Sequence, residues 1–151
     1  MKLLLDTTIL GQLCHSTKTI NQTYNAGLVR LLSVDPAEMT VFLPGICDYE
    51  LRRKLLHLVA IGKAHSKSIK RLDELRIVLR FLPIDSAIML QAAKFWAESR
   101  LRGTPTSSSA GLDGDVILAA TAALMGGTVV TSNERHLAQF VPTARWEEVS
   151  G

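Results

Sequence analysis

Short apolar segments alternate with longer amphipathic segments along most of this chain. Three of the short segments have the length and composition of buried strands: Lys2–Leu5, residues 39–43 and residues 128–131. The segments between them carry apolar side chains at helical spacing. Because neighbouring parallel strands need a long, usually helical connection, this alternation predicts an α/β fold. We expect a three-layer α/β/α sandwich around a mostly parallel sheet of four or five strands.

The expected elements follow one another closely. Helices are expected at residues 21–33, 46–61, 66–79, 86–101, 113–125 and 132–139, and two further strands at residues 81–84 and 144–147. Residues 103–111 are rich in Gly, Ser and Thr, which is typical of a loop. The chain has 151 residues, and domains usually hold roughly 100–200. We therefore expect a single domain over residues 1–151.

The composition excludes several classes of protein. With 47% hydrophobic and 21% charged residues, the chain can bury a core, unlike a disordered segment. Its two cysteines show no CxxC spacing, so neither a disulfide framework nor a zinc knuckle is expected. No apolar run approaches the roughly 20 residues of a membrane span, and Asp6 follows Met1 too closely for a signal peptide. We expect a cytoplasmic protein with no membrane contact.

Polar residues stand near the ends of the expected strands. Asp6 follows the first strand, and Glu50 lies in the helix after the second. Asp115 opens the apolar helix that leads into the strand at residues 128–131, and Asn133 follows that strand. Ligands of open parallel sheets bind beyond the carboxyl ends of the strands, so these side chains could converge at one sheet edge. Oxygen ligands hold Mg²⁺ or Mn²⁺, ions that activate water and neutralise phosphodiester charge.

Each of these polar residues also has a simpler structural explanation. Asp6 could cap the helix that follows it, and Asn133 could cap the next helix after its strand. Asp115 could serve as a cap too, with Asp113 as a competing one. Glu50 stands beside a run of basic residues and could be a solvated surface glutamate. No one of these residues identifies an active site by itself.

Other catalytic arrangements find little support in the sequence. The four histidines show neither an HxxxH nor an HxH pair, and we expect them at the surface or in packing. Neither GxxxxGK nor GxGxxG occurs, so nucleotide-cofactor chemistry is not expected. The serines at residues 107–109 lack the strand–turn–helix setting of a nucleophile elbow.

Four segments, in order, resemble the motifs of the PIN-domain nucleases. The first is the strand and acid of residues 3–10, and the second is the helical segment 48–51 that contains a glutamate. The third is residues 112–122, where an acid opens an Ala-rich apolar helix, and the fourth is the strand and Thr-Ser-Asn of residues 127–133. The last two are the more specific. The resemblance covers nearly the whole chain, and the chain length suits the single-domain form of VapC-like toxins.

The resemblance implies a metal-dependent active site. Asp6, Glu50 and Asp115 would be catalytic and would ligate Mg²⁺ or Mn²⁺. Asn133 would take the fourth catalytic position, where many relatives have aspartate. A neutral amide adds no negative charge, so we expect one firmly bound ion rather than two. The neighbouring residues that could orient carboxylates or water, or support a second ion, are Thr7, Thr8, Asp113, Thr131 and Glu134.

The same resemblance implies a function and its partners. The protein would be a Mg²⁺- or Mn²⁺-dependent endoribonuclease that hydrolyses RNA phosphodiester bonds. It would act as the toxin of a type II toxin–antitoxin pair, with a cognate antitoxin and a second copy of itself, in a homodimer, as partners. The alternative is a non-catalytic PIN-like domain that binds RNA or a protein partner after losing the fourth acid at Asn133.

Positive charge is concentrated in one part of the chain. Residues 50–80 hold nine basic and three acidic residues, although the net charge of the whole chain is only +3. A basic surface of this kind could bring RNA phosphates to an acidic cleft. The candidate RNA-binding residues are Arg52, Arg53, Lys54, Lys63 and Lys67. Alternatively, these side chains form the solvated faces of two amphipathic helices or contact a protein partner.

Overall fold

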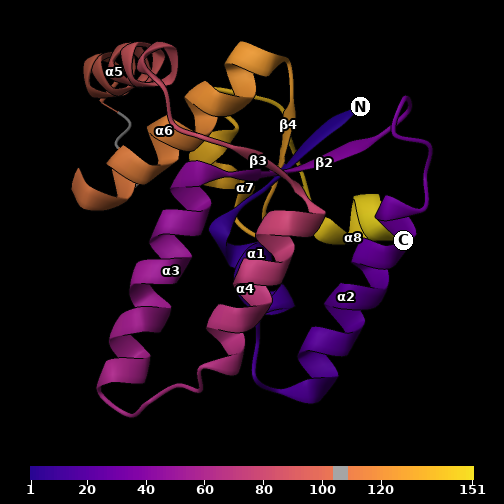
Figure 1. The fold of residues 1–151 in the computed structure, drawn as a ribbon. Helices are drawn as coiled ribbons and strands as arrows, with labels where there is room; N and C mark the ends of the chain where they lie inside the picture. Colours follow the sequence, from indigo (N-terminus) through magenta and orange to yellow (C-terminus); the bar gives the residue numbers. More distant parts are fainter. Residues whose placement is uncertain (104–108) are drawn as a thin grey trace.

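A computed structural model describes the backbone of residues 1–103 and 109–151. Within these ranges, five strands form one sheet, and every neighbouring pair of strands is parallel (Figure 1). The strands are β1 (Lys2–Leu5), β2 (Thr40–Pro44), β3 (Arg80–Leu82), β4 (Thr128–Val130) and β5 (Thr143–Ala144). The helices are α1 (Thr7–Leu13), α2 (Lys18–Leu32), α3 (Gly45–Ala60), α4 (Lys67–Val78), α5 (Ser86–Leu101), α6 (Ser109–Met125), α7 (Glu134–Leu137) and α8 (Trp146–Ser150).

The order of the strands places β1 at the centre of the sheet. The sheet runs β3-β2-β1-β4-β5, so the chain first builds outward on one side of β1 and then continues on the other. Leu3 is paired with Val41 of β2 on one side and with Thr128 of β4 on the other. The direction of strand addition therefore reverses between β1 and β4. A reversal of this kind opens a crevice at the carboxyl ends of the two strands.

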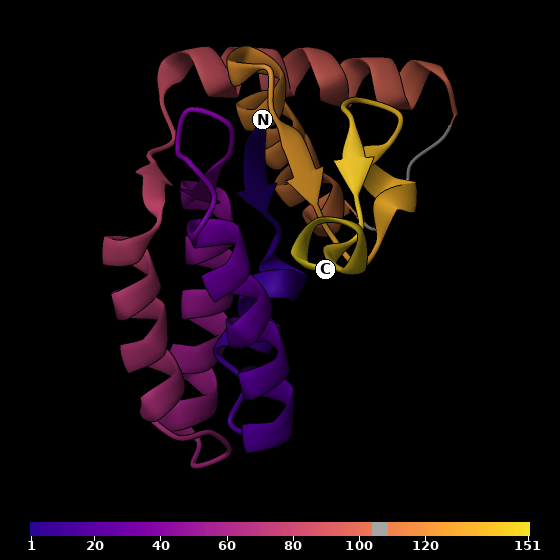
Figure 2. The same cartoon turned by 90° about the vertical axis from the view of Figure 1, so that its right-hand side faces the viewer.

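Helices cover both faces of the sheet, which confirms the predicted three-layer sandwich. Right-handed crossovers place the helices that follow β1 and β2 on one face and those that lead into β4 and β5 on the other. The side chains of Leu3, Leu4 and Leu5 have no exposed surface, because both faces of β1 are covered. Figure 1 and Figure 2 show α2, α3 and α4 projecting together beyond one end of the sheet, whereas α5 crosses the opposite end. None of the described helices is long and apolar enough to span a membrane.

The observed elements differ from the predicted ones mainly near the carboxyl-terminal end. α6 begins at Ser109, inside the segment expected to be a loop, and residues 104–108 of that segment lie outside the described residues. The expected strand at residues 144–147 was wrong beyond Ala144, because α8 begins at Trp146. The indole of Trp146 stacks on Tyr24 of α2 at a ring distance of 5.4 Å. Burying this large ring against α2 requires the chain to turn away from the sheet.

Candidate active site

Asp6 lies at the crevice between β1 and β4. Its backbone N–H donates a hydrogen bond to the carbonyl of Val130 at 3.0 Å, which fixes the residue beside the end of β4. Its Oδ1 accepts from the backbone N–H of Thr7 at 2.6 Å, and Oδ2 accepts from the hydroxyl of Thr131 at 2.6 Å. Burial raises the pKa of Asp6 above its ordinary value, more than the hydrogen bonds from its threonine partners lower it. Asp6 therefore caps α1, as the simpler explanation proposed, and also lies at the crevice.

Glu50 lies beside Asp6 and is joined to it through Thr7. The Thr7 hydroxyl donates to Oε1 of Glu50 at 3.0 Å, while the Thr7 backbone N–H bonds Asp6. The carboxylate of Glu50 is partly buried, and burial raises its pKa. The hydrogen bond from Thr7 lowers that pKa, and the negative charge of Asp6 raises it. The alternative of a fully solvated surface glutamate does not fit, because Glu50 is partly buried and its pKa is raised by the negative charge of Asp6.

Gly114 lets the Glu50 carboxylate lie directly against α6. A Cβ added to Gly114 would lie 2.5 Å from Oε2 of Glu50, a distance too short for any side chain. The next residue along α6 is Asp115, so the turn of α6 that Glu50 contacts also carries Asp115. This role of Gly114 was not predicted from the sequence. The available signal was a glycine, which disfavours helix, between two acids near the start of an otherwise apolar helix.

His136 of α7 lies beside Asp115. Its Nδ1 lies 3.6 Å from Oδ2 of Asp115, and the two form an ion pair when the imidazole is protonated. His136 also lowers the pKa of Asp6 electrostatically, so it lies within range of both acids. All four histidines were expected at the surface or in packing, and the place of His136 beside Asp115 was not predicted. Its position three residues after Asn133, in the helix that follows β4, was the signal that could have identified it.

We call Asp6, Glu50 and Asp115 the acid cluster. The remaining predicted residues differ in whether they contact it. Asn133 is exposed, and its backbone N–H donates to the hydroxyl of Thr131 at 3.0 Å. Its side chain makes no capping hydrogen bond to α7. The Thr8 hydroxyl donates to Oδ2 of Asp6 at 3.4 Å, which places Thr8 beside the cluster. The Glu134 carboxylate instead accepts from Thr143 and Arg145, on the side of β5.

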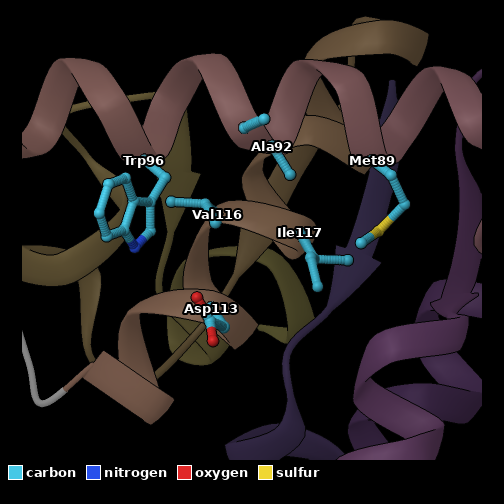
Figure 3. Close-up of a pocket in the computed structure, with 7 residues that line it drawn as sticks. Met89, Ala92, Trp96, Asp113, Val116 and Ile117 are labelled. Atoms are coloured by element: carbon cyan, nitrogen blue, oxygen red, sulfur yellow. The ribbon is translucent and has the colours of Figure 1, made fainter.

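Asp113 lines a pocket on the α5 side of α6. It is exposed and lines an apolar pocket of about 430 Å³ between α5 and α6, together with Met89, Trp96 and Ile117 (Figure 3). The structure therefore gives neither Asp113 nor Glu134 a contact with Asp6 or Glu50 among the described residues. In this arrangement neither Asp113 nor Glu134 is placed to help Asp6 and Glu50 hold a second ion.

The donor set at this edge of the sheet suits a hard divalent cation. Asp6 and Glu50 are partly buried carboxylates, and no described Lys or Arg lies within ion-pair distance of either. Their mutual repulsion would be relieved by a cation with oxygen ligands, which is the preference of Mg²⁺ and Mn²⁺. Among the described residues, no three Cys, His, Asp or Glu side chains are yet grouped closely enough to hold one ion. A shared ion therefore requires Asp115 and the other two acids to move closer together.

The predicted RNA-binding residues fall into different environments. Arg52 bonds Asp48 through Nε at 3.2 Å and Nη2 at 3.0 Å, and it bonds Asp73 through Nη1 at 2.7 Å. Its charge therefore joins α3 to α4 and is already paired with two carboxylates. Arg53 is exposed and lies over the ring of Tyr49, 5.0 Å from its centre. The three lysines line two adjoining hollows: Lys54 and Lys63 line the larger, and Lys67 lines the smaller.

Comparisons with known proteins point to one family. The family model of the PIN domain matches residues 3–140. The structure of VapBC-1 from nontypeable Haemophilus influenzae is similar, with a TM-score of 0.71 and 19% identity, covering 97% of this chain and 99% of that one. VapBC2 from Rickettsia felis, bound to a promoter DNA fragment, gives a TM-score of 0.72 and 17% identity, covering 97% and 99%. VapC20 from Mycobacterium tuberculosis, described as a sarcin–ricin loop cleaving toxin, gives a TM-score of 0.63 and 16% identity, covering 92% of this chain and 96% of that one.

The family match and the structural likeness carry different weight. At these identities the solved structures show a shared fold. A search of curated protein sequences gives no significant match. The family model is the sequence-level finding, and it spans the segments that hold Asp6, Glu50, Asp115 and Asn133. The family match confirms the resemblance seen in the four motifs, and this chain belongs to the PIN domain family.

Proposed function

We propose that this protein is a VapC-like endoribonuclease that depends on Mg²⁺ or Mn²⁺ and hydrolyses RNA phosphodiester bonds. The observation that carries the proposal is the link between Asp6 and Glu50 through Thr7, beside Asp115, at the crevice between β1 and β4. Membership of the PIN domain family, whose members are nucleases, supports the reaction class. The likeness to VapBC structures supports the toxin role.

In this proposal the three acids and the residues around them have distinct roles. Asp6, Glu50 and Asp115 hold the ion, which supplies activation of water and neutralisation of charge on the phosphodiester. The threonines at positions 7 and 131 donate to the carboxylates and fix their orientation. Asn133 provides an exposed amide near the crevice, with a donor and an acceptor but no charge. A neutral fourth position favours one firmly held ion over two.

The proposed partners follow from the relatives. Several similar structures are VapBC complexes, so a cognate antitoxin is the expected protein partner. We also propose a homodimer as the assembly, as the sequence motifs imply. VapC20 is described as a toxin that cleaves the sarcin–ricin loop, which supports RNA as the substrate of this chain. A toxin that acts on RNA would work in the cytoplasm.

Cleavage of labelled RNA tests the proposal. Wild type, Asp6→Asn and Asp115→Asn would be compared in Mg²⁺, in Mn²⁺ and in EDTA, with Glu98→Gln as an exposed acid on α5 that controls for the loss of one charge. We expect cutting by wild type and the control in either metal, a loss of at least about 100-fold in both aspartate variants, and no cutting in EDTA. Full activity of Asp6→Asn would overturn the proposal. RNA binding without cleavage by wild type would instead favour the non-catalytic alternative.

A further inference from the structure

A groove extends from the threonines that follow Asp6 toward the loop between α3 and α4. It has a volume of about 510 Å³, and at one end it is lined by hydroxyl-bearing residues adjacent to Asp6, namely Thr7, Thr8 and Ser132. Lys54 of α3 contributes to its wall. At the far end it is lined by residues 63–65 of the α3–α4 loop, a lysine, an alanine and a histidine. The groove therefore connects the candidate active site to the basic part of the chain.

A second hollow of about 370 Å³ continues the same surface. It shares His15 and His65 with the groove, and its lining adds Lys67 and Arg71. Among the described residues that line either hollow, the charged side chains are four cations and no carboxylate. Arg71 is paired with Glu74 at 3.1 Å. The lysines that line the hollows make no ion pair with a described residue, so their charge is available to an anionic ligand.

The two histidines are held in the same way. The backbone N–H of Thr17 donates to Nδ1 of His15 at 2.9 Å, and the backbone N–H of Lys67 donates to Nδ1 of His65 at 3.1 Å. Because Nδ1 is an acceptor in both rings, the proton of the neutral imidazole lies on Nε2. Each histidine therefore retains an N–H donor, which suits an anionic oxygen. A metal ion would need an unprotonated ring nitrogen.

The composition of the lining favours a nucleic-acid backbone over its bases. No Phe, Tyr or Trp is among the described residues that line the two hollows, so they offer no aromatic platform for stacking bases. Cations and N–H donors bind phosphate oxygens without reading sequence. A polymer of phosphodiesters bound here would also reach the acid cluster at the end lined by Thr7 and Thr8.

We infer that this groove holds the RNA strand on one side of the scissile bond, with Lys54, Lys63, His15 and His65 contacting backbone phosphates. The inference rests on the proposed nuclease function and adds to it the path of the substrate. It also has a consequence for substrate choice, because an RNA too short to enter the groove forgoes these contacts and binds more weakly.

Kinetics with two substrates test the inference. The pairs Lys54→Gln/Lys63→Gln and His15→Gln/His65→Gln would be assayed with a labelled single-stranded RNA and with bis(p-nitrophenyl) phosphate, which has one phosphodiester and cannot extend along the groove. We expect the lysine pair to raise KM for RNA about five- to tenfold, the histidine pair to raise it by a smaller factor, and both to leave the small substrate unchanged. The matched control is Lys70→Gln/Lys94→Gln, which removes two exposed lysines elsewhere. Thermal melting would verify that every variant is folded.

A binding measurement separates failure of this inference from failure of the nuclease proposal. RNA affinity would be measured against salt concentration in the Asp115→Asn background, with Mg²⁺ present. Loss of two phosphate contacts should reduce the slope of log affinity against log salt by about 1.4, at roughly 0.7 per contact. A slope and an RNA KM equal to those of the control pair would overturn the inference. Groove-dependent binding of polyglutamate but not of RNA would also overturn it, in favour of an acidic protein partner. Absence of cleavage by wild type, with groove-dependent RNA binding intact, would count against the nuclease proposal alone.

Discussion

Replacing Gly114 by alanine should disable the active site without unfolding the protein. The added Cβ would lie 2.5 Å from Oε2 and 3.1 Å from Cδ of Glu50. The carboxylate must recede by about 1 Å to reach an ordinary contact distance. That movement would strain the 3.0 Å hydrogen bond between Thr7 and Glu50. A displacement of about 1 Å in a catalytic group costs on the order of 100-fold in rate, so we expect kcat to fall by about that factor.

The stability of Gly114→Ala should change little. Alanine favours a helix interior by roughly 1 kcal/mol over glycine, and the weakened hydrogen bond costs about the same. Gly11→Ala provides the comparison for stability, because its added methyl group would meet no atom within 4 Å. Urea unfolding would measure both variants, and RNA cleavage would measure Gly114→Ala. A kcat of Gly114→Ala equal to that of wild type would refute the placement of Glu50 against Gly114. A fall of several kcal/mol in the free energy of unfolding would refute the claim that the clash is local.

Three further predictions concern the contacts around the site. Thr7→Val removes the hydrogen bond that lowers the pKa of Glu50, so the acid limb of the pH–rate profile should move to higher pH and kcat should fall about tenfold; an unmoved limb would contradict this. Burial raises the pKa of Asp6, so ionising this carboxyl costs more in the folded protein than in the unfolded chain. The free energy of unfolding therefore falls as pH rises above the ordinary pKa of a carboxyl group. Asp6→Asn should therefore raise Tm at pH 7 in EDTA, and added Mn²⁺ should raise Tm of wild type only. Arg52→Ala removes the bidentate partner of the buried Asp48 carboxylate, so urea unfolding should show that the free energy of unfolding falls by about 2–3 kcal/mol. Arg76 Nη1 also lies 3.6 Å from Oδ2 of Asp48, and a fall under 1 kcal/mol would show that Arg76 alone suffices to pair this carboxylate.

The elements that could be predicted are those with a strong local signal. The predicted helix at residues 86–101 matches α5, because Asp85 caps it by accepting from the N–H of Ile88 at 2.9 Å and Gly103, just beyond its end, adopts φ +63°. The leucines of β1 form a continuous apolar run because both faces of a central parallel strand are buried. The α8 helix was not predictable in this way, since its start depends on the contact between Trp146 and Tyr24, which are far apart in the sequence.

The same distinction applies to the candidate site. Asp6 could be predicted because an acid directly after a strand occupies the sheet edge whatever the other contacts are. The roles of Arg52, Glu134 and His136 depend on which element each packs against. Their positions in the sequence suggested that Arg52 and Glu134 lie beside the predicted site. In the fold, Arg52 instead bonds Asp73 of α4, and Glu134 accepts a hydrogen bond from Thr143 of β5.

Crystals of the protein soaked in Mn²⁺ and measured for anomalous scattering would test the central claim most directly. We expect one strong anomalous peak at the carboxyl ends of β1 and β4, from an ion ligated by oxygens of Asp6, Glu50 and Asp115. The peak should be lost in Asp6→Asn crystals treated in the same way. A Mn²⁺ peak away from these three carboxylates, or none at concentrations that support cleavage, would contradict it.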